Sequence, residues 1–570
     1  MAGTNEQQHE QHEQHEYQHP QWQYAPVPAP APDYGNGYGY GYGPGFDPEP
    51  VPEPEPATPG YVVPEVPVSA WAVDTRRATW ISRGIVLCIL LVQAGLSLRL
   101  QGRAFVDEAL YIASGHYQIG QLLDGTAPPT DFSGYFSGHP MLYPVLAAAV
   151  DSVGGLAAVR LVSLVFTLST TVLLYGVTSR LFNQRAALAA AALFSVLEST
   201  VFLGNFATFD ALALFLLACA AWIIVRTGRS HPALVLLAVP AAALAPAVKY
   251  AAALYLPALV VLAVLSAYPY RGARAMVRGL LLGVGIVLLL GSVAYLSGSL
   301  DGIGFTTTGR AHGTDSALSV FRRSAEWGGV MLLVAVGGAI DYIRRARMGE
   351  MPWALGDTPG RLRRTALGLL MCGTALLAPA YQAHLHDDIS LFKHVGFGLF
   401  FAAPMAGLGI NRLMGAHFRY PQLGIMVWVA ALVTGMAQTQ SLYHPPDSTQ
   451  MVAAMRKVVT GQGKGGTYLA EEFEIPAYYL RDVTGWKQWK STFGIDYTDK
   501  DGERHTGNDG FKAAVREGHF DAIVLSGGVT PEADQAITGA LRGNAKYRLL
   551  TVLHSTDDYG STTYRIWVKQ

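Results

Sequence analysis

The stretch WISRGIVLCILLVQAGLSL, residues 80–98, is followed directly by RLQGRAFVDEALY, residues 99–111. The first stretch contains one charged residue, Arg83, and as a helix it is long enough to cross the roughly 30 Å hydrocarbon core of a bilayer. The second stretch places two adjacent carboxylates, Asp107 and Glu108, just beyond the end of that helix. These residues predict a membrane protein with an acidic pair at the surface of the bilayer.

The composition of the whole chain also indicates an integral membrane protein. Of its 570 residues, 50% are hydrophobic and 15% are charged, which is too apolar for a soluble protein of this size. The formal net charge of −1 argues against a nucleic-acid partner, because such binding requires a basic surface. The three cysteines each lie in an apolar run, which argues against a disulfide framework. The first apolar stretch starts only near Trp80, so we expect it to remain as an anchor in a bacterial plasma membrane.

About eleven apolar segments between Trp80 and Met436 are long enough, or nearly long enough, to span the bilayer. Arginine clusters alternate with these segments, and the positive-inside rule places the clusters in the cytoplasm. This pattern predicts a cytoplasmic N-terminus and an extracytoplasmic C-terminus. It also requires the apolar stretch 141–153 to be a juxtamembrane or re-entrant helix, since Arg160 would otherwise lie on the wrong side.

The composition divides the chain into three regions. Residues 1–75 form a low-complexity tail rich in Gln, His, Glu, Tyr, Gly and Pro, which cannot build a packed core. Residues 76–442 hold the apolar segments, and residues 443–570 have the pattern of a soluble, extracytoplasmic α/β domain. The strands expected in that domain are 467–471, 492–497, 521–526 and 547–553. Its Ser526-Gly527-Gly528 segment lacks the lysine and the spacing of a phosphate-binding loop, so we interpret it as a turn.

Asp107 and Glu108 have an ordinary explanation and a functional one. Carboxylates at the start of a helix complement its dipole, which is worth about 0.3 to 1 kcal/mol. The polar residues of the predicted outer loops, however, gather on one side of the membrane. Ionisable groups near helix ends in a membrane are costly unless they are paired or functional, so this clustering points to one outward-facing cavity.

Residues 107–111, DEALY, resemble the Asp-Glu-x-x-Tyr signature of glycosyltransferase family 39, which includes the protein O-mannosyltransferases and the bacterial aminoarabinose transferases. Further segments resemble motifs of this family in the same order, and the likeness spans about residues 80–415. These segments are 139–143, 160–161, 208–212, Lys249 with 254–257, and 390–394 with Pro404. Two positions depart from the pattern. Tyr250 replaces the usual glycine after Lys249, and Leu110 replaces the arginine of the aminoarabinose transferases, which argues against that subgroup.

The resemblance implies a GT-C fold with the donor lipid in the membrane and its sugar at the outer surface. The implied donor is a polyprenyl-monophosphate sugar, for which a mannose-like sugar is one option, and the acceptor is a protein, a lipid or a cell-wall glycan. Asp107 is the expected general base, which takes the proton of the acceptor as it attacks the anomeric carbon with inversion. Glu108 is expected to orient Asp107 or to help hold a metal.

Outward-facing polar residues are expected to bind the substrates. Lys249, Arg310 and Lys393 are cations that can neutralise the departing phosphate, with snorkelling to the interface as their ordinary alternative. Asp210 matches a motif of the family but also suits a helix cap. The two histidines near the motifs either contact substrate or form a polar lid. The residues assigned to substrate binding are Tyr111, His116, His139, Asp210, Lys249, Arg310 and Lys393.

A compact cluster near residue 385 suggests a divalent metal ion as a cofactor. His384, His386 and Asp387 combine imidazole and carboxylate groups, which together can ligate such an ion beside the donor phosphate. Their spacing matches no recognised metal signature, and surface loops often collect such residues. An ordinary polar loop therefore remains the alternative.

Two other classes of protein compete with a glycosyltransferase. A polytopic transporter or flippase for a lipid-linked sugar predicts inverted repeats and interrupted helices near the middle of the membrane. The sequence shows no such repeat, and its polar residues collect on one side. A membrane-anchored scaffold would need site chemistry in the C-terminal domain, where the sequence shows none. We therefore expect a polytopic α-helical membrane glycosyltransferase of the GT-C type.

Overall fold

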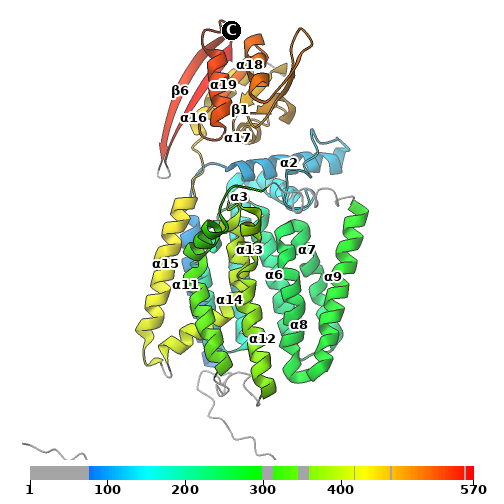
Figure 1. The fold of residues 1–570 in the computed structure, drawn as a ribbon, viewed down its shortest axis with the longest axis vertical. Helices are drawn as coiled ribbons and strands as arrows, with labels where there is room; N and C mark the ends of the chain where they lie inside the picture. The colour runs from blue at the N-terminus through cyan, green and yellow to red at the C-terminus, as the bar shows by residue number, and fades with distance from the viewer. Residues whose placement is uncertain (1–75, 298–311, 345–357, 416–417, 463–464, 558–559) are drawn as a thin grey trace, which may run out of the picture. The chain divides into compact units, whose positions relative to one another are not determined.

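The computed structural model describes residues 76–297, 312–344, 358–415, 418–462, 465–557 and 560–570 (Figure 1). The low-complexity residues 1–75 lie outside this set. Up to Leu442 the described chain forms helices and their connections. The helices are α1 (Arg76–Leu98), α2 (Val106–Asp124), α3 (Tyr143–Leu181), α4 (Gln184–Ser195), α5 (Glu198–Leu203), α6 (Phe209–Arg226), η1 (Pro232–Ala238), α7 (Val239–Val248), η2 (Tyr250–Tyr255), α8 (Leu256–Arg271), η3 (Gly272–Ala275), α9 (Met276–Ser297), α11 (Ala317–Arg344), α12 (Thr358–Thr374), α13 (Leu377–Leu385), α14 (Leu391–Met414) and α15 (Pro421–Leu442).

Helix α2 begins just after α1 ends, so the acidic pair opens its first turn. In Figure 1, α2 lies across the ends of the long helices instead of running parallel to them. One face of α2 is buried and packs against α3, and it includes Ala109, Ile112 and Ala113. The fold therefore holds the acidic pair at the end of the helical bundle.

Helix α3 is interrupted at Gly154 and Gly155. Gly155 has φ +64° and ψ −166°, a conformation that residues with a side chain rarely adopt. The interruption separates residues 143–153 from the long apolar stretch that follows. This break agrees with the short extra helix that the distribution of arginines requires.

The length and hydropathy of the individual helices identify fewer membrane spans than the sequence predicts. Among the described residues, seven runs are long and apolar enough to cross a membrane, or eight if α12 and α13, bent by 43°, count as one span. The run Tyr250–Leu296 has 47 residues and would measure about 70 Å as one straight helix, but its parts α8 and α9 pack against each other. The shorter pieces α4, α5 and α7 do not reach the length of a span. The chain is thus a polytopic helical membrane protein, but the predicted eleven spans exceed what length and hydropathy support.

Helix α14 lies at the centre of the bundle, and 94% of its most apolar 18-residue stretch is buried. Glycines allow its neighbours to approach closely. A side chain at Gly407 would collide with the carbonyl of Ala186 in α4, and one at Gly409 with the carbonyl of Val334 in α11. This packing holds α14, which begins at Leu391, directly against α4 and α11.

Beyond Leu442 the chain forms a mixed α/β region. Its five-stranded sheet has the order β2-β1-β5-β7-β6, in which β1 is parallel to β2 and β5, and β7 is antiparallel to β5 and β6. A separate two-stranded sheet joins β3 and β4. The elements are α16 (Thr449–Gln462), β1 (Tyr468–Ala470), α17 (Glu474–Tyr479), η6 (Trp486–Gln488), β2 (Trp489–Ser491), β3 (Asp496–Thr498), β4 (Arg504–Thr506), α18 (Gly507–Glu517), β5 (Ala522–Leu525), α19 (Pro531–Leu541), β6 (Tyr547–Asp557) and β7 (Gly560–Lys569).

The predicted strands near 467–471, 521–526 and 547–553 are confirmed by β1, β5 and β6. The prediction of one strand at 492–497 is wrong, because the chain there leaves β2 of the large sheet and enters β3 of the small one. Helices α18 and α19 cover one face of the large sheet, where Phe511 and Ile537 pack with Leu525.

The α/β region contacts the helical bundle through α17 and the residues that follow it. The buried carboxylate of Asp151 in α3 accepts hydrogen bonds from the hydroxyl of Tyr478 at 2.5 Å and from Nη2 of Arg481 at 2.8 Å. The backbone amide of Ala104 donates to the hydroxyl of Tyr479 at 3.0 Å. These contacts place α17 against the start of α2, next to the acidic pair.

Candidate active site

Glu108 is completely buried and is bound to the backbone around the start of α2. Arg160 donates to its carboxylate from Nε at 2.9 Å and from Nη2 at 2.6 Å. The backbone amides of Phe105 and Ala207 donate to the same carboxylate at 3.0 and 2.8 Å. Because four donors surround this carboxylate, we interpret Glu108 as a positioning residue that fixes the start of α2.

Arg160 completes this arrangement from α3. Its Nη1 donates to the carbonyl of Gly102 at 2.9 Å, and its Nη2 to the carbonyl of Arg103 at 2.9 Å. The arginine therefore holds the connection between α1 and α2 as well as Glu108. Segment 160–161 matches a motif of the family, but the role of Arg160 as the partner of Glu108 was not predicted, although an isolated charge in an apolar run was the signal.

Asp107 has a different environment from its neighbour. Its side chain is 39% exposed, and Nζ of Lys393 donates to its Oδ2 at 2.7 Å. The ammonium group of Lys393 also lies 4.9 Å from the ring centroid of Phe206. Asp107 is therefore the acid of the pair that a substrate can reach.

Asp210 forms a second pair in the first turn of α6, where it is 1% exposed. Nζ of Lys249 lies 3.4 Å from its Oδ1, and Nε2 of His394 lies 3.5 Å from the same oxygen. The hydroxyl of Thr208 donates to Oδ2 at 3.0 Å. Lys249 stands between α7 and η2, where its extended backbone interrupts the helical chain.

The first turn of α14 connects the two acids. Lys393 reaches Asp107, and the next residue, His394, reaches Asp210. The structure thus brings together Asp107, Asp210, Lys249 and Lys393 from four helix ends that are far apart in sequence. His394 was not predicted as a site residue, although it is the last residue of the matched segment 390–394. Two carboxylates and two ammonium groups in fixed positions form a preorganised electrostatic site.

Tyr111 forms part of an aromatic wall beside this cluster. Its ring packs edge-on against Phe136 and Phe209, with centroid distances of 5.1 and 4.5 Å. Burial, together with the nearby charges of Asp107 and Asp210, raises the pKa of its hydroxyl well above the ordinary value of 10.0. The hydroxyl therefore remains a hydrogen-bond donor at neutral pH.

The two predicted histidines lie in different places. Nε2 of His116 is 2.8 Å from the carboxylate of Asp151, so His116 belongs to the contact with α17 and not to the four-residue cluster. His139 accepts a hydrogen bond from the amide of Met141 through Nδ1 at 3.2 Å, and its own amide donates to the carbonyl of Ala247 at 2.9 Å. Burial lowers the pKa of His139. His139 is thus bonded to Ala247, which lies two residues before Lys249 in the chain.

The ring of His312 lies near two of the predicted metal ligands, with centroid distances of 5.6 Å to His384 and 6.3 Å to His386. Nδ1 of His386 lies 2.8 Å from the carbonyl oxygen of Asp315, and the carboxylate of Asp387 accepts a hydrogen bond from the amide of Ile389. In the described part of the chain, the one group of three His, Cys, Asp or Glu side chains whose ligand atoms all lie within 4.8 Å of one another is Asp499, Glu503 and His505. Metal binding by His384, His386 and Asp387 therefore stays a prediction. Arg310 lies outside the described residues.

The fold and the charged cluster define a class of protein, a polytopic membrane glycosyltransferase with its polar groups gathered at the helix ends. Residues 138–295 match the family described as dolichyl-phosphate-mannose-protein mannosyltransferase. The match confirms the predicted enzyme class, a glycosyltransferase of the kind that depends on a polyprenyl-phosphate sugar. It includes His139, Asp210 and Lys249. No curated protein matches the chain in sequence.

Solved structures of two enzymes resemble this chain. The oligosaccharyltransferase of Archaeoglobus fulgidus with Zn and sulfate shares 10% identity, has a TM-score of 0.50, and aligns over 84% of this chain and 72% of its own. The archaeal oligosaccharyltransferase AglB of Archaeoglobus fulgidus, in complex with an inhibitory peptide and a dolichol-phosphate, shares 10% identity, has a TM-score of 0.50, and aligns over 85% of this chain and 74% of its own. ArnT of Cupriavidus metallidurans bound to undecaprenyl phosphate shares 14% identity, has a TM-score of 0.44, and aligns over 85% of this chain and 98% of its own. The likeness to the oligosaccharyltransferase concerns the fold, which is of the predicted GT-C type.

Proposed function

We propose that this protein transfers a sugar from a polyprenyl-monophosphate carrier to an extracytoplasmic acceptor, with inversion at the anomeric carbon. The observation that carries the proposal is the half-exposed Asp107, paired with Lys393 beside the buried pair of Asp210 and Lys249. The family description names dolichyl-phosphate mannose, and AglB binds a dolichol-phosphate. Both support a polyprenyl-phosphate carrier. The acceptor is a hydroxyl or amine of a protein, a lipid or a glycan.

In this proposal Asp107 is the general base. As the acceptor oxygen or nitrogen forms a bond to the anomeric carbon, its proton passes to the carboxylate of Asp107. The bond between the anomeric carbon and the phosphate oxygen breaks, and the polyprenyl phosphate leaves with that electron pair. Attack from the side opposite the phosphate gives inversion. The partial exposure of Asp107 supports this role, since Glu108 has no free position for an acceptor.

Lys249 and Lys393 would bind the phosphate as it departs. Both ammonium groups are desolvated and held by carboxylates, so little reorganisation is needed when charge develops on the leaving group. Tyr111 and His139 would line the same site. Metal binding by His384, His386 and Asp387 stays a prediction, and we assign no step of the reaction to a divalent ion.

We further propose the topology and the division of the chain that the arginine pattern predicts. Residues 1–75 would be a cytoplasmic tail, residues 76–442 a glycosyltransferase domain with eleven crossings, and residues 443–570 an extracytoplasmic domain. The pieces α4 with α5, η1 with α7, and α8 and α9 as separate passes would supply the additional crossings. Labelling of single cysteines with a membrane-impermeant maleimide in intact cells tests this topology. A cysteine at exposed Arg548 should react, whereas one at exposed Arg229 should not.

The function is tested by supplying radiolabelled polyprenyl-phosphate sugars and candidate acceptors to the purified protein. Asp107→Asn should reduce transfer by roughly 10²-fold or more, because it removes the base while retaining the size of the side chain. Its thermal unfolding temperature should stay near that of the parent. Asp124→Asn is the matched control, since Asp124 is an exposed acid at the other end of α2.

Two results would contradict this proposal. A folded Asp107→Asn protein that transfers sugar as fast as the parent would show that Asp107 is not the base. Consumption of the donor without a covalent product in the parent would indicate a hydrolase or a flippase instead of a transferase.

A further inference from the structure

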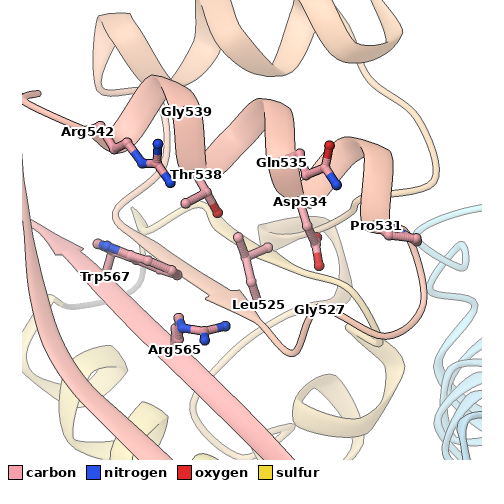
Figure 2. Close-up of a pocket in the computed structure, with 10 residues that line it drawn as sticks. All are labelled: Leu525, Gly527, Pro531, Asp534, Gln535, Thr538, Gly539, Arg542, Arg565 and Trp567. Atoms are coloured by element: carbon pink, nitrogen blue, oxygen red, sulfur yellow. The ribbon is translucent and has the colours of Figure 1, made fainter.

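The C-terminal α/β region contains a cavity of about 400 Å³ between helix α19 and the large sheet (Figure 2). Leu525 and Gly527 place it at the carboxyl end of β5, which runs parallel to β1. Ligands in open sheets with parallel strands commonly bind outside the carboxyl ends of those strands. The volume also lies in the range typical of small-ligand sites.

Two arginines and a tryptophan reach the cavity from opposite walls. Thr538 comes from α19 and Arg542 directly follows that helix, whereas Arg565 and Trp567 come from β7 (Figure 2). Arg565 and Trp567 are two positions apart on one strand, so both side chains lie on the same face of the sheet. Within the described part of the chain, neither arginine has a carboxylate partner. Two unpaired guanidinium groups therefore flank one indole ring.

A buried acid completes the polar lining. Asp534 is 7% exposed, and its carboxyl group adjoins the carboxylate of Glu471. Burial and the neighbouring carboxylate of Glu471 raise the pKa of Asp534 to about 8, so the group is largely protonated at neutral pH. The protonated carboxyl group can donate a hydrogen bond as well as accept one.

The loop after β5 is held rigidly beside this acid. The carboxylate of Glu471 accepts hydrogen bonds from the backbone amides of Ser526, Gly527, Val529 and Thr530. The Ser526-Gly527-Gly528 segment is thus an ordered turn that shapes the rim of the cavity. A preformed rim lowers the entropic cost of binding a small ligand.

We propose that this cavity binds a saccharide that carries an anionic group, either a carboxylate or a phosphate ester. The face of Trp567 suits the apolar face of a sugar ring, and Arg542 and Arg565 suit the anion. Asp534, Gln535 and Thr538 would bind the hydroxyl groups. If the proposed function holds, this ligand is the acceptor glycan, and only that last assignment rests on the proposed function.

Titration calorimetry on the detergent-purified full-length protein tests the proposal without any donor. The probes are tetragalacturonate, maltotetraose as a neutral oligosaccharide of equal length, glucose 6-phosphate, and inorganic phosphate. At least one anionic saccharide should bind roughly 10-fold or more tightly than both maltotetraose and inorganic phosphate. Arg565→Gln should weaken that binding about 10-fold, whereas Arg548→Gln, an exposed arginine on the neighbouring strand β6, should not change it.

Three outcomes would overturn the proposal. They are no binding of either anionic saccharide up to about 10 mM, equal binding of inorganic phosphate, and equal effects of the Arg565 and Arg548 variants. Trp567→Ala should weaken binding of the saccharide but not binding of phosphate. If this variant does not fold, Trp567→Phe, which retains an aromatic ring, replaces it with the same expected result. Asp107→Asn should bind the saccharide normally, so a failure of the proposed transfer reaction and a failure of this site are distinguishable.

Discussion

At the scale of single residues, Asp107 and Glu108 are neighbours in sequence with opposite surroundings. Glu108 has four donors and no exposure, whereas the side chain of Asp107 is 39% exposed and faces a lysine. A buried carboxylate that accepts hydrogen bonds from an arginine and two backbone amides stabilises the local fold. A carboxylate that a substrate can reach is able to take a proton from it. The same pair of residue types therefore divides into a positioning residue and a proposed base.

This division predicts that Glu108→Gln destabilises the protein. Removal of the charge leaves Arg160 buried without a counter-ion, at a cost of about 3 to 5 kcal/mol. The thermal unfolding temperature in detergent should fall by several degrees, and a second change, Arg160→Gln, should recover part of the loss. Glu326→Gln is the control, because Glu326 pairs with Arg322 at an exposed position. An unchanged unfolding temperature for Glu108→Gln would refute the positioning role.

A second residue-scale prediction concerns Glu472 and Glu474, next to the start of α17. Burial, and to a smaller extent neighbouring carboxylates, raises the pKa of each to about 7 from 4.5. Between these two values the folded chain retains protons that the unfolded chain has lost, so the free energy of unfolding falls as the pH rises toward 7. The Glu472→Gln, Glu474→Gln double variant should therefore gain stability over the parent at pH 8 but not at pH 4. Unfolding temperatures at the two pH values measure this difference, and equal differences at both would contradict it.

At the scale of elements, close helix packing positions the cations of the site. A side chain at Gly338 in α11 would collide with the carbonyl of Met405 and the backbone of Gly409 in α14. Gly337, the preceding residue, faces open space. Since α14 carries Lys393 and His394 in its first turn, displacement of this helix moves the partners of both acids.

Gly338→Ala should therefore lower both stability and transfer, whereas Gly337→Ala should leave both nearly unchanged. The collision is expected to cost about 1 to 3 kcal/mol, as overpacking of a tight contact does. Unfolding temperature and sugar transfer, measured on both variants, test this. Similar behaviour of the two variants would show that α11 and α14 do not need their close contact.

At the scale of the whole molecule, the C-terminal α/β region is held to the helical bundle through Asp151. This buried carboxylate binds His116, Tyr478 and Arg481, which come from two separate regions of the chain. Its partners hold α17 against α2, directly beside the proposed base. The region is thus placed to influence how an acceptor reaches Asp107.

Asp151→Asn should loosen this contact, because an amide cannot compensate the charge of Arg481. Hydrogen exchange should increase in residues 474–481, and transfer to a large acceptor should fall more than binding of the donor. Asp482→Asn, which removes an exposed partner of Arg456 nearby, is the control and should change exchange little. Unchanged exchange in the Asp151 variant would rule out this contact as the principal link.

The sequence by itself determined the membrane class, the helical fold type and the identity of the acidic motif, because hydropathy, arginine distribution and short motifs are local properties of the chain. It predicted more membrane spans than length and hydropathy identify among the described helices, and it joined β2 and β3 into one strand. Only the tertiary structure decided that Arg160 neutralises Glu108, that Lys393 and His394 serve different acids, and that two arginines flank Trp567. These arrangements join residues far apart in sequence, and they depend on the helix breaks and contacts that determine which side chains meet.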